Sequence, residues 1–279
     1  QIVPNEPLVQ SKQSSTNYYV SADSSVSHEV ILRVRNLGKD YGGREVLRRI
    51  SFDVDRGQFM VVLGPNGAGK STLFRCITRL TEPSDGTIHY EDACVNTLNQ
   101  AELARLRCSI GFVFQQFNLV KRLTALDNVL AGCLGRTPLW RVMLRRFTHQ
   151  DRQMALGCLD AVGMLEFAYR RVDGLSGGQQ QRVAIARTLA QDAHIIIADE
   201  PIASLDPESA LQVMQILKRV ARERGITVLC SLHQVDHALR MADRVIGMND
   251  GKILLNKPTQ EVTPDDTRTI YMRVAEAAD

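Results

Sequence analysis

Long apolar runs are the first feature that this 279-residue sequence lacks. The longest, Phe59–Leu63 and Ile195–Ala198, are far shorter than the roughly 20 residues that a membrane-crossing helix needs. Neither sign of charge is in excess, with 34 basic against 31 acidic residues, so charge favours neither nucleic acid nor an acidic membrane surface as a partner. We therefore expect a chain that forms no membrane channel by itself and binds no nucleic acid.

Clustered cysteines are also absent, because the six cysteines are scattered and no two of them form a CxxC pair. This spacing argues against a disulfide framework or a zinc site and predicts buried, reduced thiols of a cytosolic protein. No basic segment leads into an apolar core near the start, so we expect no secretory signal.

The first 28 residues differ in composition from the rest, since they contain seven serines and little apolar periodicity. We interpret residues 1–28 as a flexible tail, with a partner-binding segment as the alternative. We expect one domain over residues 29–250, with a helical subdomain at about 116–182. Residues 251–279 are expected to form a short C-terminal extension containing a helix at Thr267–Ala277.

From Glu29 onward, strand patterns alternate with helix patterns, which indicates an α/β fold with a mixed β core and an inserted α-helical subdomain. The strands are predicted at Glu29–Val34, Val46–Val54, Phe59–Leu63, Ile195–Ala198 and Thr227–Leu232. Helices are predicted at Lys70–Leu80, Gln100–Leu106, Gln179–Ala190 and Pro207–Arg224, the last with Asp206 as its N-cap.

A glycine-rich segment directly after the Phe59–Leu63 strand matches the pattern GxxxxGK[ST] of a phosphate-binding P-loop, or Walker A motif. Its residues are Gly64, Pro65, Asn66, Gly67, Ala68, Gly69, Lys70 and Ser71. Backbone N–H groups and the helix N-terminus would hold phosphate oxygens, Lys70 would reach the β- and γ-phosphates, Ser71 would bind Mg²⁺, and Thr72 would contact the α-phosphate side. The alternative is a glycine-rich turn before a helix, but the strand–loop–helix context favours a P-loop NTPase.

Two adjacent acids follow the buried strand at Ile195–Ala198, as in a Walker B motif. Ligands of α/β proteins bind at the carboxyl ends of such strands. We expect Asp199 to hold Mg²⁺ through water and Glu200 to orient and polarise the attacking water. Alone, the pair could be two acids in a loop; the P-loop makes the catalytic interpretation the stronger one.

The segment Leu175–Gln179 reads LSGGQ, and here the sequence resembles the ATP-binding cassette (ABC) ATPases, from about Glu29 to Asp250. The resemblance implies a homodimer of two chains arranged head to tail. Each ATP would lie between one P-loop and the Ser176, Gly177, Gly178 and Gln179 of the opposite chain. Physically, these residues open a helix with free N–H groups and a hydroxyl, a second anion site.

Four further positions match motifs of the same family, and the resemblance implies their roles. Tyr41 would stack on adenine, and Gln115 would sense Mg²⁺ and a membrane partner. Asp206, in a D-loop reading Ser-Leu-Asp-Pro, would contact the opposite subunit, and His233 would act near the γ-phosphate. Catalysis is thus expected from Glu200, His233, Lys70 and Gln115, and Mg²⁺ binding from Ser71, Gln115 and Asp199.

Two functional classes remain open for such a cassette, a transporter subunit and a soluble machine for DNA repair or translation. The sequence has one P-loop, one signature and no sustained heptads, which favours the transporter. Such a subunit would sit peripherally on the cytoplasmic face of the inner membrane and drive a separate integral membrane permease.

Four segments resemble the ATPase subunit of phosphonate importers: Phe114–Val120, Gly135–Arg141, Ile202–Ala210 and Leu232–Asp236. This implies an ATPase of the translocase class, energising uptake of phosphonate, phosphite or phosphate-like oxyanions. In such importers a separate periplasmic or extracellular substrate-binding protein captures the solute. The alternatives are an ABC transporter of another solute, an exporter, or a non-transport ABC ATPase.

Apolar residues recur at helical spacing in Leu139–Phe147, with Arg141, Arg145 and Arg146 between them. The segment is interpreted either as a core-facing helix with a solvated basic side or as a surface for the permease or lipid headgroups. On the second interpretation, Trp140→Ala is expected to abolish transport coupling and to spare basal ATPase activity. Unchanged transport by that variant would exclude this role.

Overall fold

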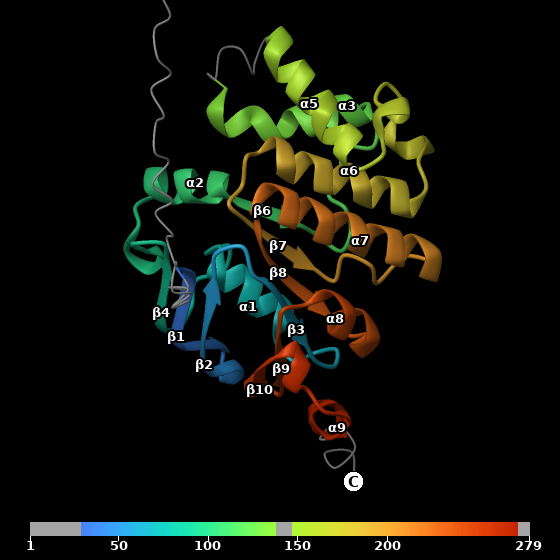
Figure 1. The fold of residues 1–279 in the computed structure, drawn as a ribbon. Coiled ribbons are helices and arrows are strands. Elements are labelled where there is room, and N and C mark those ends of the chain that lie inside the picture. The colour runs from blue at the N-terminus through green and yellow to red at the C-terminus, as the bar shows by residue number, and fades with distance from the viewer. Residues whose placement is uncertain (1–28, 138–146, 273–279) are drawn as a thin grey trace, which may run out of the picture.

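The computed structural model describes residues 29–137 and 147–272, which fold around two sheets (Figure 1). The larger sheet has the order β10-β9-β3-β8-β7-β6, and the smaller, antiparallel sheet has the order β2-β1-β4-β5. The strands of the larger sheet are β3 (Phe59–Leu63), β6 (Ile110–Val113), β7 (Ile195–Asp199), β8 (Thr227–Leu232), β9 (Arg244–Asn249) and β10 (Lys252–Pro258). Those of the smaller sheet are β1 (Val30–Tyr41), β2 (Arg44–Asp55), β4 (Asp85–Tyr90) and β5 (Ala93–Cys94). The predicted mixed α/β fold is confirmed.

Helices cover the larger sheet on one side, and the smaller sheet with α1 covers the other (Figure 1). The α-helices are α1 (Lys70–Ile77), α2 (Gln100–Ser109), α3 (Ala125–Leu130), α5 (His149–Ala161), α6 (Gly177–Ala190), α7 (Pro207–Arg224), α8 (Val235–Met241) and α9 (Pro264–Met272). Short 3₁₀ helices are η1 (Val95–Thr97), η2 (Ala131–Arg136), η3 (Leu165–Phe167), η4 (Val172–Gly174) and η5 (Thr259–Glu261).

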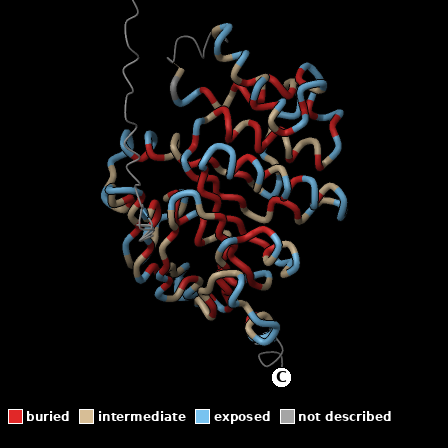
Figure 2. The backbone as a smooth tube through the Cα atoms, in the orientation of Figure 1, coloured by how far each residue is buried: buried red, intermediate tan, exposed pale blue. Residues whose placement is uncertain are grey.

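The central strand β3 explains why its sequence is a continuous apolar run. Val61 and Leu63 point into the core shared with α3, α5, α6, α7 and α8, whereas Met60 and Val62 point into the core shared with α1 and the smaller sheet. Both faces of the larger sheet are therefore buried, as the red interior strands in Figure 2 show.

Several helix boundaries follow from local chemistry. The carboxylate of Asp206 accepts a hydrogen bond from the N–H of Ser209 at 2.9 Å, which caps α7 as predicted, and this bond lowers the pKa of Asp206. The helix α1 is shorter than the predicted Lys70–Leu80. It ends at Ile77, because Arg79 adopts a left-handed φ of 52° and its N–H donates to the carbonyl of Cys76, which closes the last turn.

The region expected to be helical contains α3, η2, α5, η3 and η4 before α6 begins. Residues 138–146, which include Trp140, lie outside the described residues, and Phe147 packs against the core of α3, α5 and α6. The tail at residues 1–28 and residues 273–279 also lie outside them.

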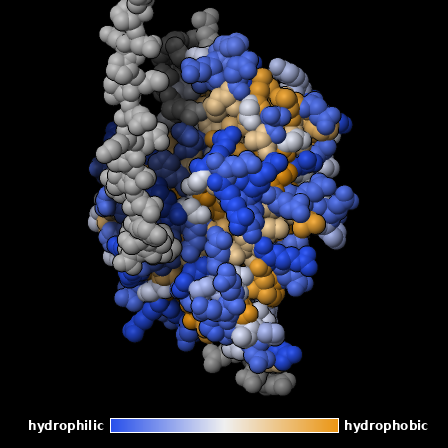
Figure 3. Space-filling model, viewed as in Figure 1, coloured by the Kyte–Doolittle hydropathy of each residue, from blue (hydrophilic) through white to orange (hydrophobic). Residues whose placement is uncertain are grey.

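Beyond residue 250 the chain contributes to the sheet, since β10 pairs antiparallel with β9. The terminal helix α9 begins at Pro264, three residues before the predicted Thr267. All six cysteines lie within the described ranges, and four of them are buried. Among residues 29–137 and 147–272, no helix combines the length and apolarity that a membrane span requires. The face seen in Figure 3 is correspondingly mostly hydrophilic, with scattered hydrophobic areas.

Candidate functional site

The loop between β3 and α1 passes so close to β9 that it requires glycine. A Cβ atom on Gly64 would lie 2.2 Å from the carbonyl oxygen of Met248. Gly69 precedes α1 with a left-handed φ of 99°, a conformation that costs glycine little. The loop thus delivers its backbone to the N-terminus of α1, where free N–H groups and the positive end of the helix dipole favour an anion.

Lys70 is the first residue of α1, and only 4% of it is exposed. Its ammonium donates to the carbonyl oxygens of Gly64 at 2.7 Å and Pro65 at 3.1 Å. It also forms an ion pair with Glu200, at 3.3 Å between Nζ and Oε1. A buried cation requires such partners. A phosphate bound in the loop would compete with Glu200 for this ammonium.

Asp199 ends β7 beside the first turn of α1. Its Oδ1 accepts hydrogen bonds from the hydroxyl of Ser71 at 3.0 Å and from that of Ser231 at 2.9 Å. The Ser231 oxygen in turn accepts from the backbone N–H of Glu200 at 2.9 Å. Glu200 has a left-handed φ of 47°, a strained conformation for a residue with a side chain. Ser231 therefore fixes both acids of the predicted pair.

A cleft of about 470 Å³ lies over this loop, and most residues of the predicted phosphate site line it. Its lining consists of Arg44, Val46, Asn66, Gly67, Ala68, Gly69, Lys70, Ser71, Thr72, Gln115 and Glu200. A Cβ on Gly67 would meet no atom within 4 Å, so the loop backbone is open to a ligand at that point. The P-loop, Gln115 and Glu200 are thus brought together.

The signature residues lie elsewhere, at the start of α6. Ser176 caps the helix by accepting from the N–H of Gln179 at 3.3 Å, while the Gln179 side chain accepts from the N–H of Ser176 at 2.9 Å. A Cβ on Gly178 would lie 2.9 Å from both Cβ and Oγ of Ser209, on α7. Close packing against α7 therefore accounts for this glycine, and Ser176 is left exposed.

Tyr41, His233 and Asp206 are also outside the set of residues that line the cleft. Tyr41 ends β1 with 49% of its surface exposed, and the ammonium of Lys39 lies 4.7 Å from its ring centroid. His233 follows β8 and is exposed, and its carbonyl oxygen accepts from the Tyr271 hydroxyl at 2.8 Å.

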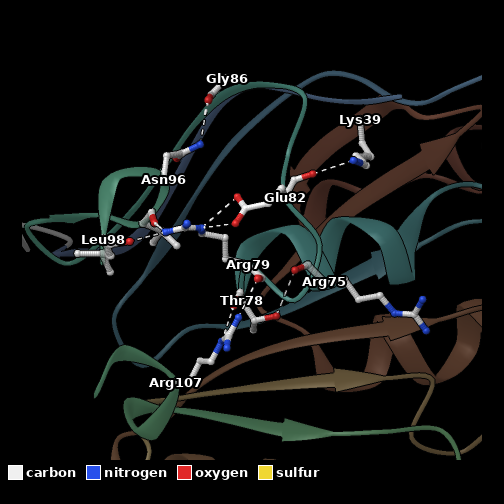
Figure 4. A network of polar contacts seen from close by, with 10 residues as sticks. Lys39, Arg75, Thr78, Arg79, Glu82, Gly86, Asn96, Leu98 and Arg107 are labelled. Carbon is white, nitrogen blue, oxygen red and sulfur yellow. Dashed lines mark hydrogen bonds and ion pairs between the residues drawn. The ribbon is translucent and has the colours of Figure 1, made fainter. Parts of the chain in front are cut away.

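A second hollow, a groove of about 400 Å³, lies between the ends of α1 and α2, the strand β6, and α6. Arg107 fixes one wall by donating to the carbonyl oxygens of Thr78 at 3.1 Å and Arg79 at 2.7 Å, as Figure 4 shows. The side-chain amide of Gln191 donates to the carbonyl of Arg107 at 2.7 Å, which joins α6 to the same wall. Arg187 of α6 reaches the carbonyl of Asn118 at 2.6 Å, just beyond Gln115, and burial lowers the pKa of Arg187.

Sequence reasoning missed four of these residues: Ser231, Arg44, Val46 and Arg187. Ser231 could have been identified from the sequence, because it places a hydroxyl inside a mostly apolar strand and a buried polar group needs a hydrogen-bond partner. Nothing local marks Arg44 and Val46, which reach the cleft only because β2 lies beside the P-loop.

Residues 47–203 match the protein family described as ABC transporter. A hypophosphite import ATP-binding protein of Stutzerimonas stutzeri is 48% identical, covering 87% of this chain and 71% of that protein. A phosphonates import ATP-binding protein of Oceanobacillus iheyensis is 46% identical, over 86% of this chain and 95% of that one. A phosphate-import ATP-binding protein of Mycolicibacterium smegmatis is 47% identical, over 89% and 95% respectively.

Solved structures are similar as well. An ATP-binding cassette in a post-hydrolysis dimer bound to ADP and Pi has a TM-score of 0.70 at 34% identity, covering 83% of this chain and all of that one. A metal-chelate type ABC transporter in an inward-facing conformation has a TM-score of 0.74 at 28% identity, over 87% of this chain and 88% of that one.

Proposed function

This chain belongs to the ABC transporter family as an ATP-binding protein, and from that premise we propose that it is the ATP-hydrolysing subunit of an importer for phosphonate or related phosphorus oxyanions. The observation that carries the proposal is the 46–48% identity, over most of the chain, to relatives named as hypophosphite, phosphonate and phosphate import ATP-binding proteins. Phosphonate, phosphite and phosphate-like oxyanions share tetrahedral phosphorus and negative charge, so they form one substrate class.

The cleft over the P-loop suits the phosphates of ATP and a Mg²⁺ ion. Among the described residues no cluster of three or more metal-ligating His, Cys, Asp or Glu occurs, which suits an ion that takes phosphates and water as its remaining ligands. Ser71, Asp199 and Gln115 would supply oxygen ligands, directly or through water, where hydroxyl and carboxylate already meet at 3.0 Å. Bound Mg²⁺ would neutralise charge on the phosphates.

The chain's own residues then have distinct roles. The P-loop N–H groups and Lys70 bind the β- and γ-phosphates, with Thr72 on the α-phosphate side, and Tyr41 stacks on adenine. Glu200 orients and polarises the attacking water, and His233 contacts the γ-phosphate. A phosphate that takes over Lys70 releases the Glu200 carboxylate from its ion pair for that task.

A second copy of the chain would complete the site. The exposed Ser176 and the N-terminus of α6 form an anion-binding end outside the cleft, so they would serve the nucleotide of a head-to-tail partner. Asp206, whose carboxylate caps α7 beside them, would lie at the same contact. A similar cassette forms a dimer bound to ADP and Pi, which supports the pairing of two chains.

A permease is the proposed second partner, docked in the groove between α2 and α6. Leu80, 51% exposed at its rim, and Phe112 and Phe114 offer apolar contact, and Arg107 and Arg187 offer donors. Because Arg187 contacts the segment just after Gln115, a docked element would act directly on that loop. The chain would sit peripherally on the cytoplasmic face of the membrane, and a periplasmic or extracellular substrate-binding protein would act through the permease only.

Stimulated ATPase activity tests the substrate class. The chain is reconstituted with its permease and substrate-binding protein and assayed with methylphosphonate, phosphite, hypophosphite, phosphate, sulfate and an amino acid. We expect severalfold stimulation by one or more phosphorus oxyanions and none by the other solutes. Stimulation by the amino acid or sulfate alone would contradict the proposed substrate class and leave the ATPase assignment standing.

A further inference from the structure

The terminal helix α9 packs against the larger sheet at a position where the strand β9 has a glycine. Ile270 is fully buried over Gly247 of β9. A Cβ atom on Gly247 would lie 2.4 Å from Cδ1 and 2.6 Å from Cγ1 of Ile270. The buried amide of Asn249 also donates to the carbonyl of Ile270 at 2.8 Å. The last described turn of α9 is therefore held in one place on β9.

This placement brings Tyr271 to the carboxyl ends of three adjacent strands. Leu63 at the end of β3 pairs with Leu232 of β8 on one side and with Gly247 of β9 on the other. The Tyr271 hydroxyl donates to the carbonyl of His233, directly after β8, at 2.8 Å. Burial raises the pKa of Tyr271, and the backbone of Gly64, directly after β3, partly offsets that rise.

One hydroxyl thus fixes the loop after β8, next to the start of the P-loop, from a helix that contributes no residue to the cleft. The Gly64 loop starts the P-loop, and its carbonyl also accepts from Lys70. His233 lies in an exposed segment between β8 and α8, and α8 has no side-chain cap at its start. A hydrogen bond from another part of the chain is therefore expected to restrain the backbone of this segment.

We propose that Tyr271 is a positioning residue, which fixes the backbone at His233, beside the start of the P-loop, so that the imidazole can reach a phosphate bound there. The inference rests on the proposed function for the role of His233. It assigns to the C-terminal segment a part in ATP hydrolysis, although that segment does not touch the cleft.

The test is Tyr271→Phe, which removes the hydroxyl and keeps the ring packed. We expect kcat for ATP hydrolysis to fall about tenfold, which corresponds to about 1.4 kcal/mol. KM for ATP should change less than about twofold, because the phosphate-binding groups themselves are untouched. Tyr169→Phe, at a tyrosine that is 74% exposed, is the matched control and should leave both constants unchanged.

Two further measurements separate positioning from general stability. In a His233→Ala background, Tyr271→Phe should cause no additional loss of kcat, because Tyr271 acts through His233. In the full-length chain without nucleotide, amide hydrogen exchange over residues 231–236 should be severalfold faster in Tyr271→Phe, with exchange in α7 unchanged. Ile270→Ala, by contrast, should lower Tm by loosening the whole helix.

Additive losses in the double variant, equal changes in kcat and KM, or unchanged exchange over residues 231–236 would each overturn the inference. The exchange measurement needs no catalytic activity. An inactive wild-type chain would therefore refute the proposed function alone, while the contact between α9 and His233 would still be tested.

Discussion

Replacing Glu200 with glutamine is expected to leave ATP binding intact and to slow hydrolysis by about 10²–10⁴-fold, the range for loss of a general base. Gln has the same shape as Glu but cannot accept the proton of the attacking water. The Glu200 backbone should be retained, since its N–H is held by Ser231 at 2.9 Å and that bond does not involve the side chain.

The second expected result for Glu200→Gln concerns assembly. If two ATP molecules join two chains, slow hydrolysis should let the closed dimer accumulate. Size-exclusion chromatography with Mg²⁺ and ATP should show a dimer for the variant and mostly monomer for the wild type. ADP should return the variant to monomer.

The matched control is Glu223→Gln, an exposed position on α7 far along the helix from the D-loop. It should hydrolyse ATP at the wild-type rate. Near-normal turnover in Glu200→Gln would show that another group activates the water and would remove Glu200 from its proposed role.

The parts of the fold that were predictable from sequence are those set by local chemistry. The α7 boundaries follow from Asp206 and Pro207 at one end and from Gly225, with a left-handed φ of 64°, at the other. The apolar run of β3 also has the predicted bounds, because strands with both faces buried need no polar residues.

The juxtaposition of Ser71 and Asp199, 128 positions apart, was predictable in outline. Ser71 lies just after β3 and Asp199 ends β7, and the carboxyl ends of such parallel strands meet at one edge of a sheet. The ion pair of Lys70 with Glu200 was not predictable, because it depends on the strained turn that Glu200 adopts after β7.

The contacts of α9 were beyond sequence reasoning for another reason. Residues after 250 were expected to be an extension, since no motif lies there. Their placement depends on Ile270 packing directly over Gly247, where a Cβ atom would clash. A single sequence does not show which side chain packs against a given glycine. The contact of Arg187 was also not predictable, because its partner is a backbone carbonyl and every residue type has one.

Replacing Lys70 with methionine is expected to weaken ATP binding about 100-fold, or about 2.7 kcal/mol, the value of one or two hydrogen bonds to a charged group. The change should appear as loss of the rise in Tm that saturating ATP causes in the wild type. Lys218→Met is the matched control. Lys218 donates to the carbonyl of Arg240 at 3.0 Å on the exposed side of α7, so this variant should keep the ATP-induced rise.

The same variant should also destabilise the chain when no nucleotide is present. Removing the ammonium leaves the Glu200 carboxylate, whose side chain is 15% exposed, and the carbonyl of Gly64 without their cation. An unpaired, largely buried charge of this kind costs about 1–3 kcal/mol. Urea unfolding in the absence of nucleotide measures this cost directly.

Adding Glu200→Gln to Lys70→Met should recover most of the lost stability, since the double variant buries no unpaired charge. It should not recover ATP binding, because the phosphates still lack the ammonium. Stability is thus expected to recover while ATP binding does not, as follows if Lys70 pairs with Glu200 in the free chain and with a phosphate in the ATP-bound chain. Equal stability of the single and double variants would show that the 3.3 Å pair carries no coupling, and that a phosphate need not displace Glu200 to bind.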